Sequence, residues 1–256
     1  MRLRQTEVCR TLPSLKHLPN KAVQLIQLLR STKREKRLGT VILFVTSRCN
    51  SFCRTCFYHE ELNQPGDLTF EQIARVSETM PAITDLWLSG GEPTLRHDAS
   101  EIIDTFIRNN GVRRLIIPTN GLVKTRVAEI VDRALGPHPS LDLYLNIALD
   151  GHGETHDRIR GVPGHWEKTL DCIEALYPLK EKYGDRFRLN ANTVVCADNY
   201  DEIENLAEFM WNAFRLDGHY FNIVRGETLV GDEIKQVPAE VLPGLYRLRS
   251  WPPSGG

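Results

Sequence analysis

The feature that most constrains this fold is an alternation of short β-rich runs with amphipathic helical runs, repeated six times from about residue 40 onward. Strands that alternate with helical patterns indicate βα units, whose strands pair in parallel within one sheet. We expect strands at residues 41–45, 85–88, 114–117, 143–149, 188–195 and 220–224. The sequence therefore predicts an α/β fold, either an open doubly wound sheet or a partial barrel, and periodicity alone does not choose between them.

The segments between these strands carry helix signals. Thr69 followed by Gln72, and Asp98 followed by Glu101, have the spacing of a capping box at a helix start. One apolar stripe has the i, i+3, i+4, i+7 spacing of a helix packed on a sheet, and we expect its members to be core residues: Ile203, Leu206, Ala207, Met210, Trp211 and Phe214.

Three regions of the chain can be separated by this pattern. Residues 1–39 precede the first strand and include a predicted helix at residues 21–30, so we expect an N-terminal helical extension. Residues 40–228 hold the βα units. From residue 229 to residue 256 the periodicity weakens and prolines recur, which indicates an irregular C-terminal segment or a truncated chain.

Charge and hydropathy argue against two classes of partner. The 32 Lys and Arg residues nearly balance the 33 Asp and Glu residues, so no overall field attracts nucleic acid or an anionic membrane. The apolar runs are strand-sized, and the amino terminus has no apolar run of secretory length. We therefore expect a cytoplasmic protein, in which cysteines stay reduced and a cysteine cluster indicates metal binding or catalysis.

Cys49, Cys53 and Cys56 form such a cluster, with the spacing C-x3-C-x2-C, directly after the first predicted strand. In α/β folds, active sites and ligand sites lie at the carboxyl ends of the parallel strands. Three thiolates from one loop can bind three irons of an iron–sulfur cluster and leave a fourth iron open to a ligand. The alternative is a zinc-stabilised, non-catalytic α/β binding module in which His59 completes a Cys3His set. Spacing alone does not name the metal.

Short polar motifs follow the later strands: Gly90-Gly91-Glu92-Pro93, Thr119-Asn120-Gly121, Leu149-Asp150-Gly151, the run from His156 to Gly161, and the run from Asn192 to Val195. Together with the cysteines, their order resembles that of the radical S-adenosylmethionine (SAM) superfamily, especially the branch with peptide-modifying enzymes and the molybdenum-cofactor cyclase. The resemblance covers residues 41 to about 226.

This resemblance implies a partial (β/α)6 TIM-like barrel with an N-terminal helical extension. It also implies that Cys49, Cys53 and Cys56 hold a [4Fe–4S] cluster, with SAM on the open iron. Reductive cleavage of SAM would then give a 5′-deoxyadenosyl radical that abstracts hydrogen from a substrate, either a peptide or a small metabolite. An electron donor such as a flavodoxin or a ferredoxin is implied as a partner.

The resemblance also assigns residues to SAM. The turn formed by Gly90, Gly91, Glu92 and Pro93 would approach it closely, with Glu92 accepting a hydrogen bond from its ammonium group. Asn120 and Asp150 are expected to contact its methionine or ribose portion. Asn192 and Val195 match positions near the adenosine.

Two departures from the family pattern move expected contacts to other residues. Ala148 stands where many relatives have Ser or Thr, so Asn146, on the same strand face, is expected to take that contact. Thr55 stands where relatives often have an aromatic residue, so Phe57 and Tyr58 are expected to flank the adenine.

Three arginines and one more cysteine complete the predicted site. Arg158 and Arg160 are expected to reach the carboxylate of SAM, although a salt bridge at a helix start is the alternative for one of them. Arg225, at the end of the sixth strand, would address that carboxylate or an anionic substrate. Cys196 is a candidate hydrogen-atom donor to a substrate radical, and a buried thiol without a role is the alternative.

Overall fold

The computed structural model describes residues 38–248. The N-terminal extension predicted at residues 1–39, including its helix at residues 21–30, therefore lies outside the described residues except for residues 38 and 39. The last eight residues of the predicted C-terminal segment also lie outside them. The three predicted regions stay predictions.

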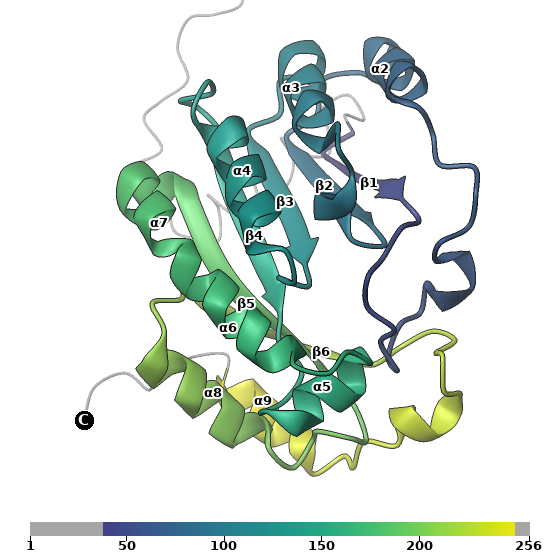
Figure 1. The fold of residues 1–256 in the computed structure, drawn as a ribbon, viewed down its shortest axis with the longest axis vertical. Coiled ribbons are helices and arrows are strands. Elements are labelled where there is room, and N and C mark those ends of the chain that lie inside the picture. Colours follow the sequence, from purple (N-terminus) through teal and green to yellow (C-terminus); the bar gives the residue numbers. More distant parts are fainter. Residues whose placement is uncertain (1–37, 249–256) are drawn as a thin grey trace, which may run out of the picture. The chain divides into compact units, whose positions relative to one another are not determined.

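Six parallel strands form one sheet in chain order (Figure 1), which confirms the predicted α/β fold and its parallel topology. Each strand begins within two residues of its predicted start. Within residues 38–248 the first and last strands do not pair, so the sheet is an open, partial barrel. The strands are β1 (Thr40–Thr46), β2 (Asp85–Gly90), β3 (Arg114–Thr119), β4 (Asp142–Ala148), β5 (Phe187–Val195) and β6 (Gly218–Ile223).

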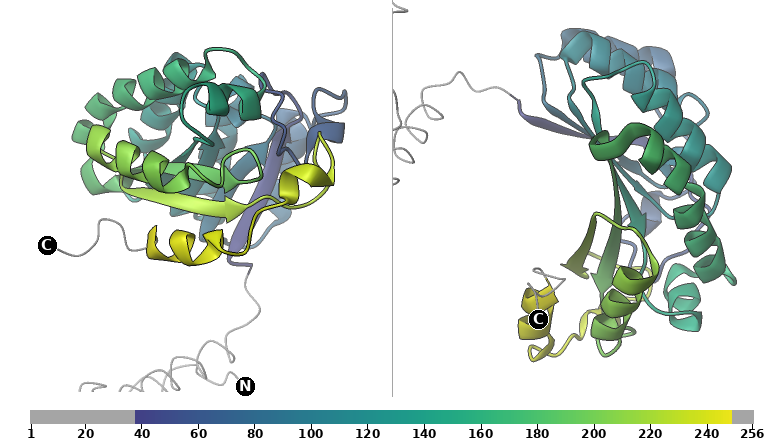
Figure 2. Two further views of the ribbon diagram at one scale, coloured as in Figure 1. Left: turned by 90° about the horizontal axis from the view of Figure 1, so that it is seen from below. Right: turned by 90° about the vertical axis from the view of Figure 1, so that its left-hand side faces the viewer.

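The helices between residues 70 and 213 follow the strands and lie along one side of the curved sheet, as the right-hand view of Figure 2 shows. The α-helices described are α2 (Phe70–Thr79), α3 (Ala99–Asn110), α4 (Lys124–Leu135), α5 (Glu154–Arg160), α6 (His165–Ala175), α7 (Tyr177–Tyr183), α8 (Ile203–Ala213) and α9 (Val241–Leu248). Short 3-10 helices are η2 (His59–Glu61), η3 (Pro93–Leu95), η4 (Gly184–Arg186) and η5 (Asp232–Lys235). The sequence did not predict α9, which forms inside the segment expected to be irregular.

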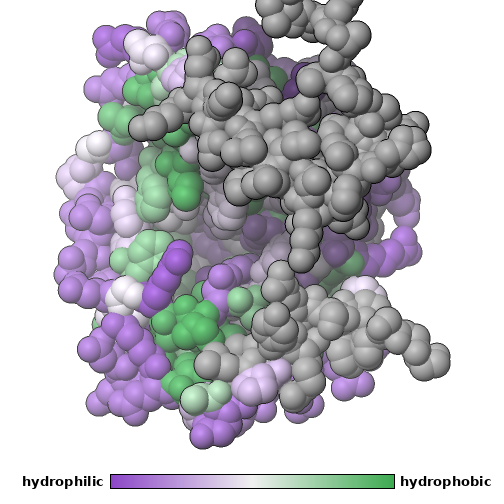
Figure 3. All heavy atoms as spheres, turned by 180° about the vertical axis from the view of Figure 1, so that it is seen from behind, coloured by the Kyte–Doolittle hydropathy of each residue, from purple (hydrophilic) through white to green (hydrophobic). Residues whose placement is uncertain are grey.

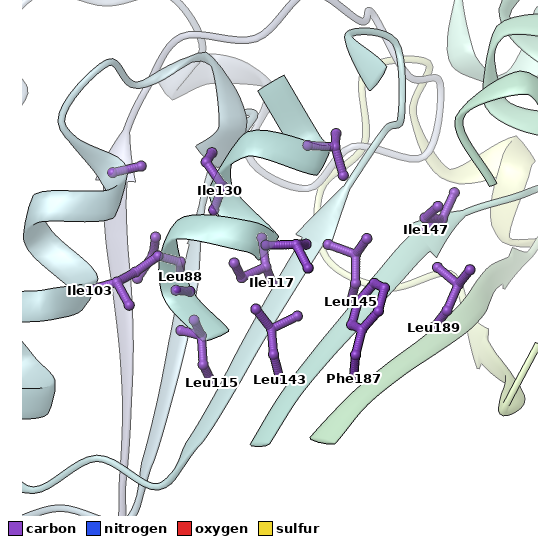
Figure 4. Close-up of a cluster of buried hydrophobic side chains, with 14 of the residues drawn as sticks. Leu88, Ile103, Leu115, Ile117, Ile130, Leu143, Leu145, Ile147, Phe187 and Leu189 are labelled. Atoms are coloured by element: carbon purple, nitrogen blue, oxygen red, sulfur yellow. The ribbon is translucent and has the colours of Figure 1, made fainter. Parts of the chain in front are cut away.

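The main core fills the space between the sheet and its helices. Alternate strand residues such as Leu88, Ile117 and Leu145 point toward Ile103 and Ile130 on the helices (Figure 4). This arrangement follows from the two-residue period of a strand, which places successive side chains on opposite faces.

The other strand residues form what we call the open face of the sheet. Ile42, with 59% of its surface exposed, and Tyr220, with 50%, both lie on it, as do Phe44 and Trp87. Apolar residues appear among polar ones on this side when the molecule is viewed from behind (Figure 3). An exposed apolar surface of this kind marks a place where a ligand or a partner binds.

The prediction that the whole apolar stripe of α8 is buried was wrong in part. Trp211 was expected in the core but is 41% exposed, while Ile203, Leu206 and Met210 of the same stripe are buried. The buried face of α8 is narrower than its apolar stripe, and Trp211 lies at the exposed margin of that stripe.

The two predicted capping boxes had different outcomes. The box of Thr69 and Gln72 forms at the start of α2. At α3 the Asp98 carboxylate makes no cap; it accepts instead from Arg96, at 2.6 Å and 3.0 Å. A nearby guanidinium therefore outcompetes the helix amides.

Among the described residues, no helix is long and apolar enough to cross a membrane.

Candidate functional site

The loop that carries the three cysteines, residues 47–58, is held on one side by the turn after β2. The Gly91 amide donates to the Thr46 carbonyl at 2.8 Å, and the Glu92 amide donates to the Arg48 carbonyl at 2.8 Å. A Cβ atom on Gly90 would lie 2.2 Å from the Thr46 carbonyl oxygen, and one on Gly91 would lie 2.3 Å from that of Arg48. The two glycines therefore allow this turn to pack backbone to backbone against the cysteine loop.

The end of α5 holds the same loop from another side. The Phe52 amide donates to the Arg160 carbonyl at 3.1 Å, and the Arg54 amide donates to the Ile159 carbonyl at 2.8 Å. These carbonyls belong to the last turn of the helix, where carbonyl groups have no partner within the helix. Gly161 follows with a φ of +66°, and a Cβ there would lie 2.5 Å from the Phe52 carbonyl oxygen.

Glu92 connects the loops after β2 and β3, where the two strands separate. Their pairing covers the first three positions of each strand and stops at Trp87. Beyond it, the Glu92 carboxylate accepts from the Thr119 hydroxyl at 2.8 Å, the Asn120 amide at 2.7 Å and the Thr94 hydroxyl at 2.6 Å. Burial raises the pKa of Glu92, and these donors act against that rise. The side chain thus replaces the missing ladder between the two strands.

Asn120 joins the loop after β3 to the cysteine loop. Its side-chain amide donates to the Asn50 side-chain oxygen at 2.7 Å and to the Ser51 hydroxyl at 3.0 Å. Its own side-chain oxygen accepts from the Leu122 amide at 3.0 Å. The polar atoms of Asn120 are therefore engaged within the protein.

Two buried histidines extend this network under the loops. The Asp150 amide donates to His156 Nδ1 at 3.0 Å, His156 Nε2 lies 2.9 Å from His165 Nδ1, and His165 Nε2 lies 3.3 Å from the Ser51 hydroxyl. Because His156 Nδ1 accepts, the neutral ring carries its proton on Nε2 and donates to His165. By the same reasoning, His165 donates from Nε2 to Ser51.

Both histidines stay neutral in the folded protein. Burial, together with the positive charge of Arg160, lowers the pKa of His156 to about 2 and that of His165 to about 4. Sequence reasoning gave neither histidine a role, because the spacing of a lone histidine in a helical run does not reveal its partners.

Arg160 lies between the network and the cysteines. One terminal nitrogen, Nη2, is 2.9 Å from the Asp150 carboxylate, and the other, Nη1, donates to Cys53 Sγ at 3.4 Å. The second carboxylate oxygen of Asp150 accepts from the Val194 amide at 2.7 Å. Asp150 and Arg160 therefore contact protein groups in this structure.

The three thiols fit a cationic, sulfur-bound metal cluster. Burial raises the pKa of Cys49 to about 11, and nearby negative charge on Cys53, Glu92 and Cys56 adds to the rise. Burial also raises the pKa of Cys56. Backbone amides of Ser51 and Tyr58 donate toward these two sulfurs and favour thiolates. The positive charge of Arg160 also favours the Cys56 thiolate, but burial outweighs these effects, and bound iron would supply further positive charge.

The zinc alternative is not favoured. His59 Nδ1 lies 3.0 Å from the Cys56 carbonyl oxygen, so its ring is hydrogen-bonded to backbone. Across residues 38–248, no three His, Cys, Asp or Glu side chains converge closely enough to hold one ion. A tetrahedral zinc needs all its donors around one point, whereas an iron–sulfur cluster spreads its irons over several positions.

Several predicted ligand residues do lie toward the open face. Asn146 accepts from the Asn190 amide group at 3.1 Å, and Asn192 accepts from the Asn222 amide group at 2.7 Å. Asn146 on β4 and Asn192 on β5 lie on neighbouring strands, two positions apart in register, because Asn192 pairs with Ala148.

Aromatic residues border the same face. The ring centroids of Tyr58 and Phe44 are 5.0 Å apart, so Tyr58 extends the apolar surface of β1. Phe57 is exposed, and the Arg225 guanidinium lies 5.9 Å from its ring centroid. The structure thus places Tyr58 beside the open face and pairs Phe57 with Arg225.

Two predicted residues, Arg158 and Val195, do not direct their side chains to this site. Arg158 is exposed and donates to the Asp198 carbonyl at 3.2 Å. The Val195 side chain points to the helix-covered side and packs with Ile203 and Ala207, so it offers at most its backbone. Period two explains that placement, since Asn192 and Val195 are three positions apart and face opposite ways.

The proposed hydrogen-donor role of Cys196 is not supported. Its thiol is fully buried with Ile159, Val224 and Ile234 in a small apolar cluster. Burial raises the pKa of Cys196 to about 12. The chain turns away from the sheet edge directly after β5, so this position enters the packing beneath the loops. The alternative of a buried thiol describes it.

Comparison with known proteins identifies the family. A family model described as the Radical SAM superfamily matches residues 43–210, which is more than half of the chain. The chain belongs to the radical SAM superfamily. This confirms the resemblance carried by the cysteine spacing and the strand-end motifs. The family's cofactors are a [4Fe–4S] cluster and SAM, and its members are enzymes.

Curated relatives match most of the radical SAM core. An AdoMet-dependent heme synthase from Methanosarcina barkeri (strain Fusaro / DSM 804) is 34% identical over 215 residues, which are 80% of this chain and 57% of that protein. A GTP 3',8-cyclase from Stenotrophomonas maltophilia (strain R551-3) is 32% identical over 173 residues, covering 66% of this chain and 50% of the relative. The chain thus spans little more than half the length of such relatives.

A solved structure shows the same fold. The crystal structure of Streptococcus suis SuiB bound to S-adenosylmethionine aligns with a TM-score of 0.58 at 19% identity, covering 89% of this chain and 50% of that one. This likeness supports the architecture of the radical SAM core.

Gly161→Ala tests the backbone clamp on the cysteine loop. The added Cβ would meet the Phe52 carbonyl, displace the loop and lower iron retention by about tenfold. Gly111→Ala is a matched control, because Gly111 has a φ of +69° at the end of α3 and nothing within 4 Å of its Cβ position. Both variants carry the left-handed strain, which costs about 1–2 kcal/mol. Equal iron content in the two reconstituted variants would contradict the clamp.

The histidine pair predicts an acid-sensitive fold. Both folded-state pKa values lie below the ordinary 6.5, so the unfolded chain binds more protons as the pH falls through that value. From pH 7 to pH 5 each histidine should lower the free energy of unfolding by roughly 2 kcal/mol. Urea unfolding of the apoprotein at both pH values measures this, and His165→Gln should reduce the loss of stability by roughly 2 kcal/mol, the share of one histidine. An unchanged pH dependence in that variant would show that His165 does not titrate with unfolding.

Proposed function

We propose that this chain is the catalytic core of an enzyme that cleaves SAM reductively and uses the resulting radical to abstract hydrogen from an organic substrate. The bound cluster would supply the electron that cleaves SAM to methionine and a 5′-deoxyadenosyl radical. The observation that carries the proposal is the cysteine loop, which offers Cys49, Cys53 and Cys56 and is clamped by the turn after β2 and the end of α5. A one-electron donor of the flavodoxin or ferredoxin kind would act with it.

The predicted SAM contacts divide into two groups in this proposal. Asn146 and Asn192 lie on the open face and Tyr58 borders it. Together with Phe57 they would hold the nucleoside portion by amide hydrogen bonds and ring contacts. Glu92 already receives hydrogen bonds from four donors, so its main contribution is to brace the turn after β2. Its contact with the SAM ammonium group stays a prediction.

We infer that the substrate is an extended small molecule with a broad apolar surface. Ile42, Phe44 and Trp87 expose apolar area on β1 and β2, and Tyr220 does so on β6. Among the relatives of at least 30% identity, several are named for porphyrin products: AdoMet-dependent heme synthase, Fe-coproporphyrin III synthase and Pre-heme d1 synthase. A porphyrin-like substrate fits the apolar surface, and Arg225 offers a cation for a carboxylate.

Anaerobic reconstitution tests the enzymatic assignment. The wild-type chain should bind about four irons and release 5′-deoxyadenosine from SAM in the presence of a strong reductant. Alanine at Cys49, Cys53 or Cys56 should reduce the bound iron to below about a tenth and abolish 5′-deoxyadenosine formation. Cys172→Ala is the control, because this buried thiol lies outside the loop.

A colourless protein with one zinc and no 5′-deoxyadenosine would overturn the assignment. The substrate class is tested separately, by asking which compound stimulates 5′-deoxyadenosine formation. An iron porphyrin with carboxylate side chains should do so, while GTP and unmodified peptides should not. Stimulation by GTP or by a peptide alone would contradict the inferred substrate class without affecting the radical chemistry.

A further inference from the structure

The buried guanidinium of Arg160 joins a carboxylate to a cysteine sulfur. Its side chain is 11% exposed, and that of Asp150 is fully buried. Nη2 lies 2.9 Å from the Asp150 carboxylate, and Nη1 donates to Cys53 Sγ at 3.4 Å. Among the described residues no group accepts from Nε, which is buried. Nη2 is therefore paired with Asp150 and Nη1 with Cys53, whereas the sequence-based expectation was a contact with the SAM carboxylate.

A donor directed at a ligating sulfur has a defined effect on a redox centre. Hydrogen bonds to the sulfurs of an iron–sulfur cluster are among the factors that set its reduction potential. Reduction adds negative charge, so a donor with positive charge stabilises the reduced state more than the oxidised state. Burial strengthens this interaction, because the local dielectric constant is lower than in water.

The remaining two cysteines receive different donors. Backbone amides of Ser51 and Tyr58 donate toward Cys49 and Cys56, and such amides carry no net charge. Cys53 receives a charged side-chain donor, and charge-assisted hydrogen bonds are about twice as strong as neutral ones. The donors around the loop are therefore unequal, and the side-chain donor is the one that a substitution can remove.

Asp150 fixes the position of this donor. Its carboxylate is itself held by the Val194 amide at 2.7 Å, so the guanidinium is anchored to the end of β5 as well as to α5. The carboxylate offsets part of the positive charge but does not replace the hydrogen bond, which points directly at the sulfur. The pair therefore works as an anchored donor.

We propose that Arg160 sets the reduction potential of the cluster by donating a hydrogen bond to Cys53 Sγ, with Asp150 as the residue that positions it. The proposal rests on the proposed function in one respect, namely that Cys53 ligates iron. Arg160 raises the potential and so eases the uptake of one electron from the donor protein.

The test is the midpoint potential of the reconstituted 256-residue chain without SAM, monitored by electron paramagnetic resonance during a redox titration. In Arg160→Gln the potential should fall. At the wild-type midpoint, its ratio of reduced to oxidised cluster should drop from one to below about one tenth, a shift of about 59 mV. Arg158→Gln is the matched control, since it removes the same charge from the same helix at an exposed position and should leave the midpoint unchanged.

A second variant covers the case in which a lone buried carboxylate disrupts the fold. The double substitution of Asp150→Asn with Arg160→Gln removes both charges together, which avoids an uncompensated buried ion. It should show the lowered potential with normal iron content. Arg160→Lys should give an intermediate potential, because it keeps the charge but loses the planar fork.

Three outcomes would overturn the proposal. These are a normal potential in an iron-loaded Arg160→Gln chain, an equal fall in Arg158→Gln, and iron loss in both the single and the double variant, which would make Arg160 a purely structural residue. Failure of the wild-type chain to assemble a [4Fe–4S] cluster would instead contradict the proposed function itself.

Discussion

Backbone hydrogen bonds hold the cysteine loop between the turn after β2 and the last turn of α5, and the positions of the other site residues depend on them. The Gly91 and Glu92 amides bind the loop on one side, and the carbonyls of Ile159 and Arg160 bind it on the other. Backbone groups approach this closely where side chains are small, so glycines stand at both contacts. The backbone of the three-cysteine loop is thereby held by the protein's own hydrogen bonds.

Polar side chains then tie this clamped loop to the neighbouring strands. Glu92 connects β2 to β3, Asn120 connects β3 to the loop, and Arg160 connects the loop to Asp150 after β4. A buried polar network stabilises a unique arrangement when its groups are paired, and it is costly when one partner is lost. The family motifs therefore serve the architecture of the site as well as its ligands.

The parallel α/β architecture and the strand starts were predictable because a buried sheet leaves a strong two-residue pattern, as in the run of β4. The cysteine loop and the glycine turn after β2 could be singled out because their chemistry requires those residue types, and the iron-binding role of the three cysteines stays a prediction. Side-chain competition was not visible: Arg96 takes the Asp98 carboxylate from α3, and Arg160 is already engaged with Cys53. The histidine pair and the burial of Cys196 depend on loop geometry that periodicity does not encode. The helix α9 was missed because prolines around it suggested irregular structure.

The early end of the pairing between β2 and β3 divides the carboxyl edge of the sheet into two parts. One part carries the cysteine loop, and the other carries Asn120 and, on β4 and β5, the amides of Asn146 and Asn192. The Glu92 carboxylate bridges the two parts by accepting hydrogen bonds from Thr119 and Asn120. A ligand that contacts both parts therefore spans a distance that backbone hydrogen bonds do not fix, and its binding energy depends on how Glu92 sets that distance.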